Sequence, residues 1–439
     1  MNRNFRALKH RAYLFVWIGS LLSNIGTWME NVGQGWVVAS QTHSPFQVEL
    51  LSFAQFIPII FLAIPAGILA DRYNRRKILM NAQIAMCFFA IVLAVVAHLG
   101  KATANLVILI TFLEGTAYAF NGPAWQSVVP HLVPRKDLES AIALNSIQYN
   151  LARLIGPALA GIIVARFGFA YAFDVNAVSF LAVIAAIAFA KIELTAPKMA
   201  EDKERRPLSG AFLWVYQNRG ARRIIISLTL FAIFGAPLQG LMPFFASDIL
   251  KIGPSGLGIL LACLGAGAVS GAFLLGKFPT YYPRHHLIPL SMFILGILEM
   301  IYSQSLNMYL SCFLLYVLGI FWLWCLISCN TAMQLLVPDH MRGRAMSILI
   351  VANLGMLPFG HLIGGGLATY VGPRKTLLIT SFFMALVGFI TLLRRVPEID
   401  GMVKSRRKIP LRYFFSEVVL ASSHRAEALS LDRSSEKIR

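Results

Sequence analysis

Residues 67–77 read GILADRYNRRK, and an apolar run of bilayer length stands on each side of them. Gly67 permits close helix approach, and Asp71, four positions later, stands among basic residues with which it can pair. An ordinary loop on the positively charged side of a membrane would explain the basic residues that end the stretch. It would not explain the glycine followed by the acid, so this stretch is the most specific sign of the fold.

The composition indicates a membrane protein throughout. Of 439 residues, 57% are hydrophobic and 13% are charged, whereas an ordinary soluble domain has about 25% charged residues. The content of 31 Phe, 13 Tyr and 7 Trp argues against disorder. A disulfide scaffold is also excluded, because the five cysteines are odd in number and all stand inside apolar runs.

Apolar stretches long enough to cross a bilayer recur along the chain. They predict an all-α membrane protein with twelve transmembrane helices. The expected spans are 12–39, 47–69, 78–98, 105–129, 140–165, 168–190, 224–248, 255–275, 286–304, 307–336, 345–370 and 373–393.

The net charge of +19 is distributed by side of the membrane. With the N-terminus in the cytoplasm, 33 of the 39 Lys and Arg residues fall in cytoplasmic segments and five in outer loops, with Arg153 inside a span. This asymmetry predicts that both termini are cytoplasmic and that the basic charge sets topology. Nucleic-acid binding is therefore not expected.

The twelve spans divide into two pseudo-symmetric six-helix halves. A weak internal repeat at an offset of 208–209 places Asn145 on Asn353 and Gly156 on Gly364. Parallel halves with a midplane cavity between them are typical of transporters. The expected organisation is an N-terminal half at 1–190, a cytoplasmic linker at 191–223, a C-terminal half at 224–395 and a basic cytoplasmic tail at 396–439.

The 67–77 stretch resembles the G-x-L-a-D-R-x-x-R-R-K signature of the major facilitator superfamily. Further matches resemble its drug and siderophore exporter branch, of the enterobactin-exporter-like, transmembrane secretion effector type. The resemblance covers about residues 5–395 and implies a major facilitator fold with a conformational latch at Gly67, Asp71, Arg72, Arg75 and Arg76. The further matches are Ser44, Pro45, Pro58, Pro65, Ala66, Ala119, Phe120, Pro123, Ala124 and the 153–161 stretch.

The fifth span resembles the antiporter signature g-x-x-x-G-P-x-x-G-G at Gly156, Pro157 and Gly161, with Ala152 and Ala160 in glycine positions. In the family this segment marks export. A packing kink at the proline is the alternative interpretation, and both can hold.

Polar side chains form stripes on the first and fourth spans, which lipid would not tolerate. The resemblance implies that the first, fourth, seventh and tenth spans line the substrate cavity, whereas interhelical polar contact is the alternative. The expected lining residues are Asn24, Thr27, Asn31, Gln34, Thr111, Tyr118, Asn121, Trp125, Gln239, Trp324, Ser328 and Thr331.

Ionisable residues inside spans are costly and usually functional. Glu30 and Glu114 are the candidates for proton coupling, with Arg153 as counter-charge. His361 is interpreted as a packing histidine. No G-x-x-x-x-G-K-[ST] loop is present, so ATP-driven transport has no support.

These features predict a multi-pass secondary transporter of the bacterial inner membrane, not an enzyme. It would be a proton-coupled exporter (an antiporter) of small amphipathic molecules such as drugs or siderophores. Its partners would be substrate, protons and the lipid bilayer, with no cofactor or metal, and it would act as a monomer. A same-fold transporter of lysophospholipid or another metabolite and a non-transporting anchor or sensor remain as alternatives.

Overall fold

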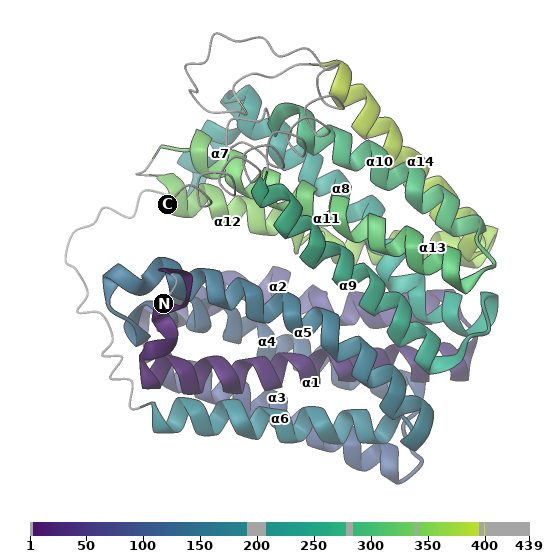
Figure 1. Cartoon of the computed structure of the whole chain (residues 1–439), viewed down its shortest axis with the longest axis horizontal. Coiled ribbons are helices and arrows are strands. Elements are labelled where there is room, and N and C mark those ends of the chain that lie inside the picture. The colour runs from purple at the N-terminus through teal and green to yellow at the C-terminus, as the bar shows by residue number, and fades with distance from the viewer. Residues whose placement is uncertain (1–2, 191–207, 278–283, 339–340, 395–398, 400–439) are drawn as a thin grey trace, which may run out of the picture. The chain divides into compact units, whose positions relative to one another are not determined.

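The computed structural model describes residues 3–190, 208–277, 284–338, 341–394 and 399, and in this part of the chain the regular structure is helical (Figure 1). The side chains of Gly67, Asp71 and Arg72 lie outside the described residues, as does the expected tail apart from residue 399. We use "first half" for residues 1–190 and "second half" for the helices from α8 onward.

The first half begins with a short 3₁₀ helix and continues through six long helices. Ser44 caps α2 by accepting from Gln47 N, and Asn74 caps α3 by accepting from two backbone amides, so sequence-local caps fix where these helices begin. The elements are η1 (Arg3–Lys9), α1 (Arg11–Thr42), α2 (Pro45–Arg72), α3 (Arg75–His98), α4 (Ala104–Leu132), η2 (Arg135–Asp137), α5 (Leu138–Phe167) and α6 (Phe169–Phe189).

The second half follows a short helix, α7, and two of its spans are built from more than one segment. The α8 helix continues into a π-helical turn, and α12 and α13 are separated by the turn at 354–356. The elements are α7 (Leu208–Gln217), α8 (Arg219–Phe244), η3 (Phe245–Ile249), α9 (Gly253–Lys277), α10 (Arg284–Gln304), α11 (Met308–Leu336), α12 (Arg342–Asn353), α13 (Leu357–Val371) and α14 (Pro373–Leu393).

Within the described residues, 11 helical segments are long and apolar enough to cross a membrane. The α1 helix is not among them although it has 32 residues, because its polar stripe lowers its mean hydropathy. With α1 added, the described chain has the twelve long helical segments that the sequence predicts. Two ends of the bundle are named here by residues that lie there: the His43 end, where α1 ends and α2 begins, and the Arg76 end, where α2 ends and α3 begins.

Two local features differ from the expected boundaries. The α7 helix and the start of α8 fall inside the stretch 191–223, which was expected to be linker, and α7 packs against α8 and α12. The expected eleventh span, 345–370, is interrupted between α12 and α13. Gly355 lies in the interruption and Pro358 in the first turn of α13, where its missing N–H is tolerated.

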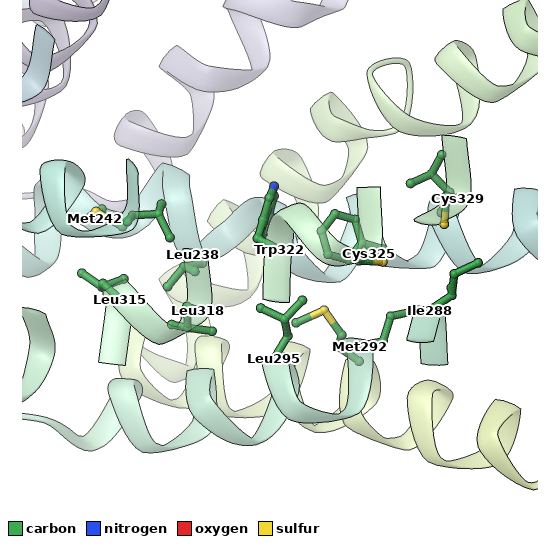
Figure 2. Packing of buried hydrophobic residues seen from close by; sticks show 14 of the residues in the cluster. Leu238, Met242, Ile288, Met292, Leu295, Leu315, Leu318, Trp322, Cys325 and Cys329 are labelled. Atoms are coloured by element: carbon green, nitrogen blue, oxygen red, sulfur yellow. The ribbon is translucent and has the colours of Figure 1, made fainter. Parts of the chain in front are cut away.

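Side chains from α8, α10 and α11 form the main apolar core of the second half (Figure 2). Trp322 lies among Leu238, Leu295 and Leu318, and its ring centroid is 4.5 Å from that of Phe231. In a membrane such a core is stabilised by van der Waals packing between the helices rather than by transfer out of water. It extends to Met29 and Val32 of α1, so the apolar packing continues from the second half into the first.

Glycines spaced seven residues apart bring α1 close to α6. A Cβ at Gly19 would lie 3.0 Å from the carbonyl oxygen of Ala182, and one at Gly26 would lie 2.9 Å from Asn176 Oδ1. Small residues permit this close approach of helices. It carries the polar stripe of α1 past Asn176, with Glu30 one turn beyond Gly26.

The α9 helix lies between α5 of the first half and α11 of the second (Figure 1). On one face a Cβ at Gly265 would lie 3.0 Å from the carbonyl oxygen of Arg153. On the other face a Cβ at Gly271 would lie 2.9 Å from the Cα of Ile320. At these two glycines the contacts of α9 are therefore with the backbone of the neighbouring helix.

Candidate functional site

A cavity of about 270 Å³ lies between the two halves and takes its lining from α1 to α6 of the first and from α8, α9 and α13 of the second. Its described lining includes two acids and a histidine but no Lys or Arg. Aromatic and amide side chains make up much of the remainder. The principal polar and aromatic lining residues are Asn24, Thr27, Trp28, Glu30, Asn31, Gln34, Gln55, Phe56, Gln83, Thr111, Glu114, Tyr118, Asn121, Tyr149, Asn176, Phe180, Gln239 and His361.

Glu30 and Glu114 meet at one amide. The Nε2 group of Gln34, one turn after Glu30 on α1, donates to Glu30 Oε1 at 2.7 Å and to Glu114 Oε2 at 3.2 Å. The two carboxyl groups also contact one another directly. Two carboxylates in contact repel one another unless one holds a proton and donates it in a hydrogen bond. This arrangement can therefore hold and release a proton.

Asn176 of α6 completes the surroundings of Glu30. Its Nδ2 group donates to Glu30 Oε2, and its Oδ1 atom lies 3.5 Å from the hydroxyl of Thr27. Both Glu30 and Asn176 are buried. Each oxygen of Glu30 thus has its own amide donor, which fixes the carboxyl group in place.

Two further amide pairs line the cavity. Gln55 of α2 donates to Asn31 of α1 at 3.1 Å, and Gln83 of α3 donates to Asn121 of α4 at 3.0 Å. Amides can donate and accept, so these pairs can exchange partners with a polar occupant.

Comparison with known proteins identifies the chain. A family model described as "Transmembrane secretion effector" matches residues 3–421. The chain belongs to the transmembrane secretion effector family. The family and the fold of the chain show that the protein is a membrane transporter rather than an enzyme.

Curated relatives of this family member are transport proteins. The staphyloferrin A transporter of Staphylococcus aureus (strain NCTC 8325 / PS 47) is 25% identical over 364 residues, covering 82% of this chain and 90% of that protein. Macrolide efflux protein A of Streptococcus pyogenes is 25% identical, covering 64% and 70%. The multidrug efflux pump Tap of Mycolicibacterium fortuitum is 23% identical, covering 89% and 98%.

Solved structures agree on the fold. A bacterial homolog of the human lysosomal transporter Spinster, in an inward-facing and unoccupied conformation, superposes with a TM-score of 0.66 at 16% identity, covering 90% of this chain and 99% of that one. The nucleoside transporter NupG superposes with a TM-score of 0.67 at 13% identity, covering 87% and 99%. The major facilitator fold expected from the sequence is confirmed.

Most of the residues expected to line a cavity in this family member lie around the one observed. Four do not. Trp125 packs against the core of the first half, and Trp324 Nε1 donates to the carbonyl oxygen of Gly271. Ser328 is fully buried, and the Thr331 hydroxyl bonds to Ile327 O of its own helix. The expected lining residues found there are Asn24, Thr27, Asn31, Gln34, Thr111, Tyr118, Asn121 and Gln239, and the coupling candidates Glu30 and Glu114 lie among them.

Arg153 does not reach the paired acids in this structure. Its guanidinium carbon lies 5.8 Å from the ring centroid of Trp28, whose ring is edge-on to Tyr149 at 6.3 Å. Trp28 and Tyr149 line the cavity, but Arg153 is not among the lining residues. Arg153 therefore lies against the Trp28 ring in a cation–π arrangement and outside the cavity lining.

The predicted antiporter-like motif mediates close packing of α5. A Cβ at Gly156 would lie 3.0 Å from Ile25 O of α1, and one at Gly161 would lie 3.1 Å from the Cα of Gly258 in α9. Pro157 lies inside the continuous helix α5. The motif thus joins α1, which carries Glu30, to α9 of the second half.

Of the predicted latch residues, Arg76 has a described role within the first half. Its guanidinium donates to the carbonyl oxygens of Ile187 at 3.2 Å and Ala188 at 2.8 Å, at the end of α6. A cation at a helix C-terminus is favourable. Arg75 begins α3, while Gly67, Asp71 and Arg72 lie outside the described side chains.

Sequence reasoning did not select Asn176, Gln55 or Gln83 as site residues. Asn176 is the only amide in its expected span, while Gln55 and Gln83 share theirs with one other amide each, and buried amides more often bridge helices than bind ligands. A signal was present for Asn176, because an amide in the middle of a span must find a partner within the protein.

Proposed function

We propose that this family member is a proton-coupled exporter of small amphipathic molecules, working as an antiporter in the bacterial inner membrane. The observation that carries the proposal is the contact between Glu30 and Glu114, joined by Gln34 and lining the cavity. An antiporter needs one site that binds either substrate or proton. Two acids that can share a proton in the lining of a cavity between the halves meet that need.

The proposed substrate is amphipathic, and it is cationic or rich in hydrogen-bonding groups. Acids and amides offer polar contacts on the first-half side, while Trp28, Phe56, Tyr118 and Phe180 offer apolar area. Support comes from the relatives, which are a staphyloferrin A transporter, a macrolide efflux protein and a multidrug efflux pump. Export rather than uptake is supported by the resemblance of the fifth span to the antiporter signature.

The proposed orientation places both termini in the cytoplasm. The Arg76 end then faces the cytoplasm, where 33 of the 39 Lys and Arg residues fall. The His43 end faces outward. We further propose that one chain is sufficient for transport, with the two halves enclosing the substrate path between them.

Proton release from purified protein tests the coupling. Adding a macrolide or staphyloferrin A to weakly buffered protein should release protons from the wild type, and Glu30→Gln and Glu114→Gln should each reduce that release. Undiminished release from both variants would contradict carboxylate coupling at this site. Efflux that does not depend on the pH gradient would favour the alternative, in which a protein of the same fold transports a lysophospholipid or another metabolite.

A further inference from the structure

Glu49 belongs to the first half, and its side chain extends into the second half. It lies in the first turns of α2 and is fully buried. Its side chain fills a recess formed by α8 and α13. A Cβ at Gly240 of α8 would collide with the Glu49 carboxylate, one at Gly364 would lie 3.3 Å from Oε1, and one at Gly365 would lie 2.9 Å from the Glu49 Cβ.

The carboxylate meets His361 at the base of this recess. His361 Nδ1 lies 2.6 Å from Glu49 Oε2, and both side chains are almost completely buried. The ring of Phe56, two turns beyond Glu49 on α2, stacks on His361 with an interplanar angle of 6° and a centroid distance of 6.2 Å. One residue from the second half is thus held by two from the first.

We propose that Glu49 and its glycine-lined recess form a latch that holds the His43 end closed, and that this end opens when the carboxylate leaves the recess. A second contact between the halves lies at the same end. His43 Nδ1 is 2.6 Å from Asp248 Oδ1, with the His43 side chain 65% exposed. The latch is therefore a buried inner contact behind an exposed outer one.

Among the described residues, the closed latch leaves one polar atom of Glu49 unsatisfied, and this favours opening. Within the described part of the chain, Glu49 Oε1 has no hydrogen-bond partner. A buried polar atom without a partner destabilises the state that buries it, so the closed form lacks the full stability of a completely satisfied pair. Withdrawal of Glu49 into water would satisfy both oxygens.

The latch also reaches the cavity. His361, Phe56 and Gly240 all contribute to the cavity lining, whereas Glu49 itself does not. An occupant that displaces Phe56 or His361 would disturb the partner of Glu49 without touching the carboxylate. His361 is thus a positioning residue that connects occupancy of the cavity with closure of the His43 end.

Hydrogen–deuterium exchange of the full chain in lipid nanodiscs measures closure directly. We expect Gly240→Ala to raise exchange in residues 45–56 and 357–371 by on the order of tenfold, because the added Cβ excludes the carboxylate. Gly366→Ala is the matched control, since a Cβ there meets no atom within 4 Å. Glu49→Ala should raise exchange in the same two segments.

The double variant Glu49→Ala/Gly240→Ala separates the latch from general damage. Both changes remove the same interaction, which is the packing of the Glu49 carboxylate in the recess. The double variant should therefore exchange no faster than the more affected single variant. Additive effects, or a Gly240→Ala profile matching that of Gly366→Ala, would overturn the latch. If Gly240→Ala fails to fold, Glu49→Ala and His361→Leu form the equivalent cycle, with the same two outcomes.

Discussion

Gln34 Nε2 of α1 lies 3.2 Å from Glu114 Oε2 of α4, and this hydrogen bond between residues 80 positions apart joins the polar stripes of the two helices. The same amide holds Glu30. Because both acids accept from the Gln34 amide, a change at either acid should alter the hydrogen bonding of the other.

Glu30→Gln should keep the fold but lose transport driven by a pH gradient. The amide has almost the shape of the protonated acid, and Asn176 and Gln34 remain beside it. In proteoliposomes carrying a macrolide, we expect gradient-driven flux to fall at least about tenfold, which corresponds to about 1.4 kcal/mol. Glu114→Gln is the comparison, and unchanged flux in Glu30→Gln with loss in Glu114→Gln would assign coupling to α4.

Asn176→Ala should destabilise the first half. It removes the donor of Glu30 Oε2 and leaves that buried oxygen without a partner, at a cost of about 1–3 kcal/mol. Thermal unfolding in detergent should show a lower Tm. Asn150→Ala is the control, because the half-buried Asn150 side chain donates to Ser146 O on its own helix and not to a buried carboxyl group. Equal Tm values for the two variants would contradict this role of Asn176.

Gly115→Ala should separate α4 from α2. A Cβ at position 115 would collide with the backbone carbonyl of Gln55, and a backbone obstacle cannot move away by changing rotamer. We expect a loss of about 1–3 kcal/mol in stability and lower yield of monodisperse protein. Gly122→Ala, seven residues later on the same helix and with open space around it, should leave both unchanged.

Asp71→Asn should impair the transport cycle more than substrate binding. The sequence places this acid among cations that it can pair with, and removing one partner of a desolvated pair leaves the others uncompensated. Equilibrium binding of a macrolide should change less than about threefold while flux falls at least about tenfold. Equal losses in both measurements would argue against a latch in the 67–77 stretch.

Reporter fusions should place both termini in the cytoplasm. Fusions at residue 200 and at the C-terminus should report the cytoplasmic side, and a fusion within 41–45, where α1 ends and α2 begins, should report the outer side. The asymmetry of Lys and Arg motivates this expectation. An external C-terminus would contradict the predicted topology.

The sequence was sufficient for the fold because the spans are predominantly apolar over a bilayer length. It also placed Glu30 and Gln34 on a polar stripe of one span and Glu114 on a polar stripe of another, since polar residues at helical spacing in a span must face protein or water. That the two stripes meet is a finding of the structure. It did not reveal the break between α12 and α13, because Gly355 and Pro358 occur in a run that stays apolar. Hydropathy records whether a residue suits lipid and is insensitive to such a turn.

The pairing of Glu49 with His361 could not be predicted for another reason. The two residues are 312 positions apart, and each is the only acidic residue or histidine in its expected span. The glycines that leave room for the carboxylate belong to different helices. A recess made by missing side chains leaves no positive pattern in a sequence. Only the packing of α2 against α8 and α13 brings these residues together.

The glycine faces of α9 have a consequence for how the molecule tolerates mutation. Where side chains interlock, a larger residue can be accommodated by a neighbour that changes rotamer, but at Gly258, Gly265 and Gly271 the neighbours are backbone atoms. A saturation screen should therefore find α9 intolerant of larger residues at these glycines, because the backbone of a neighbouring helix cannot move aside by changing rotamer.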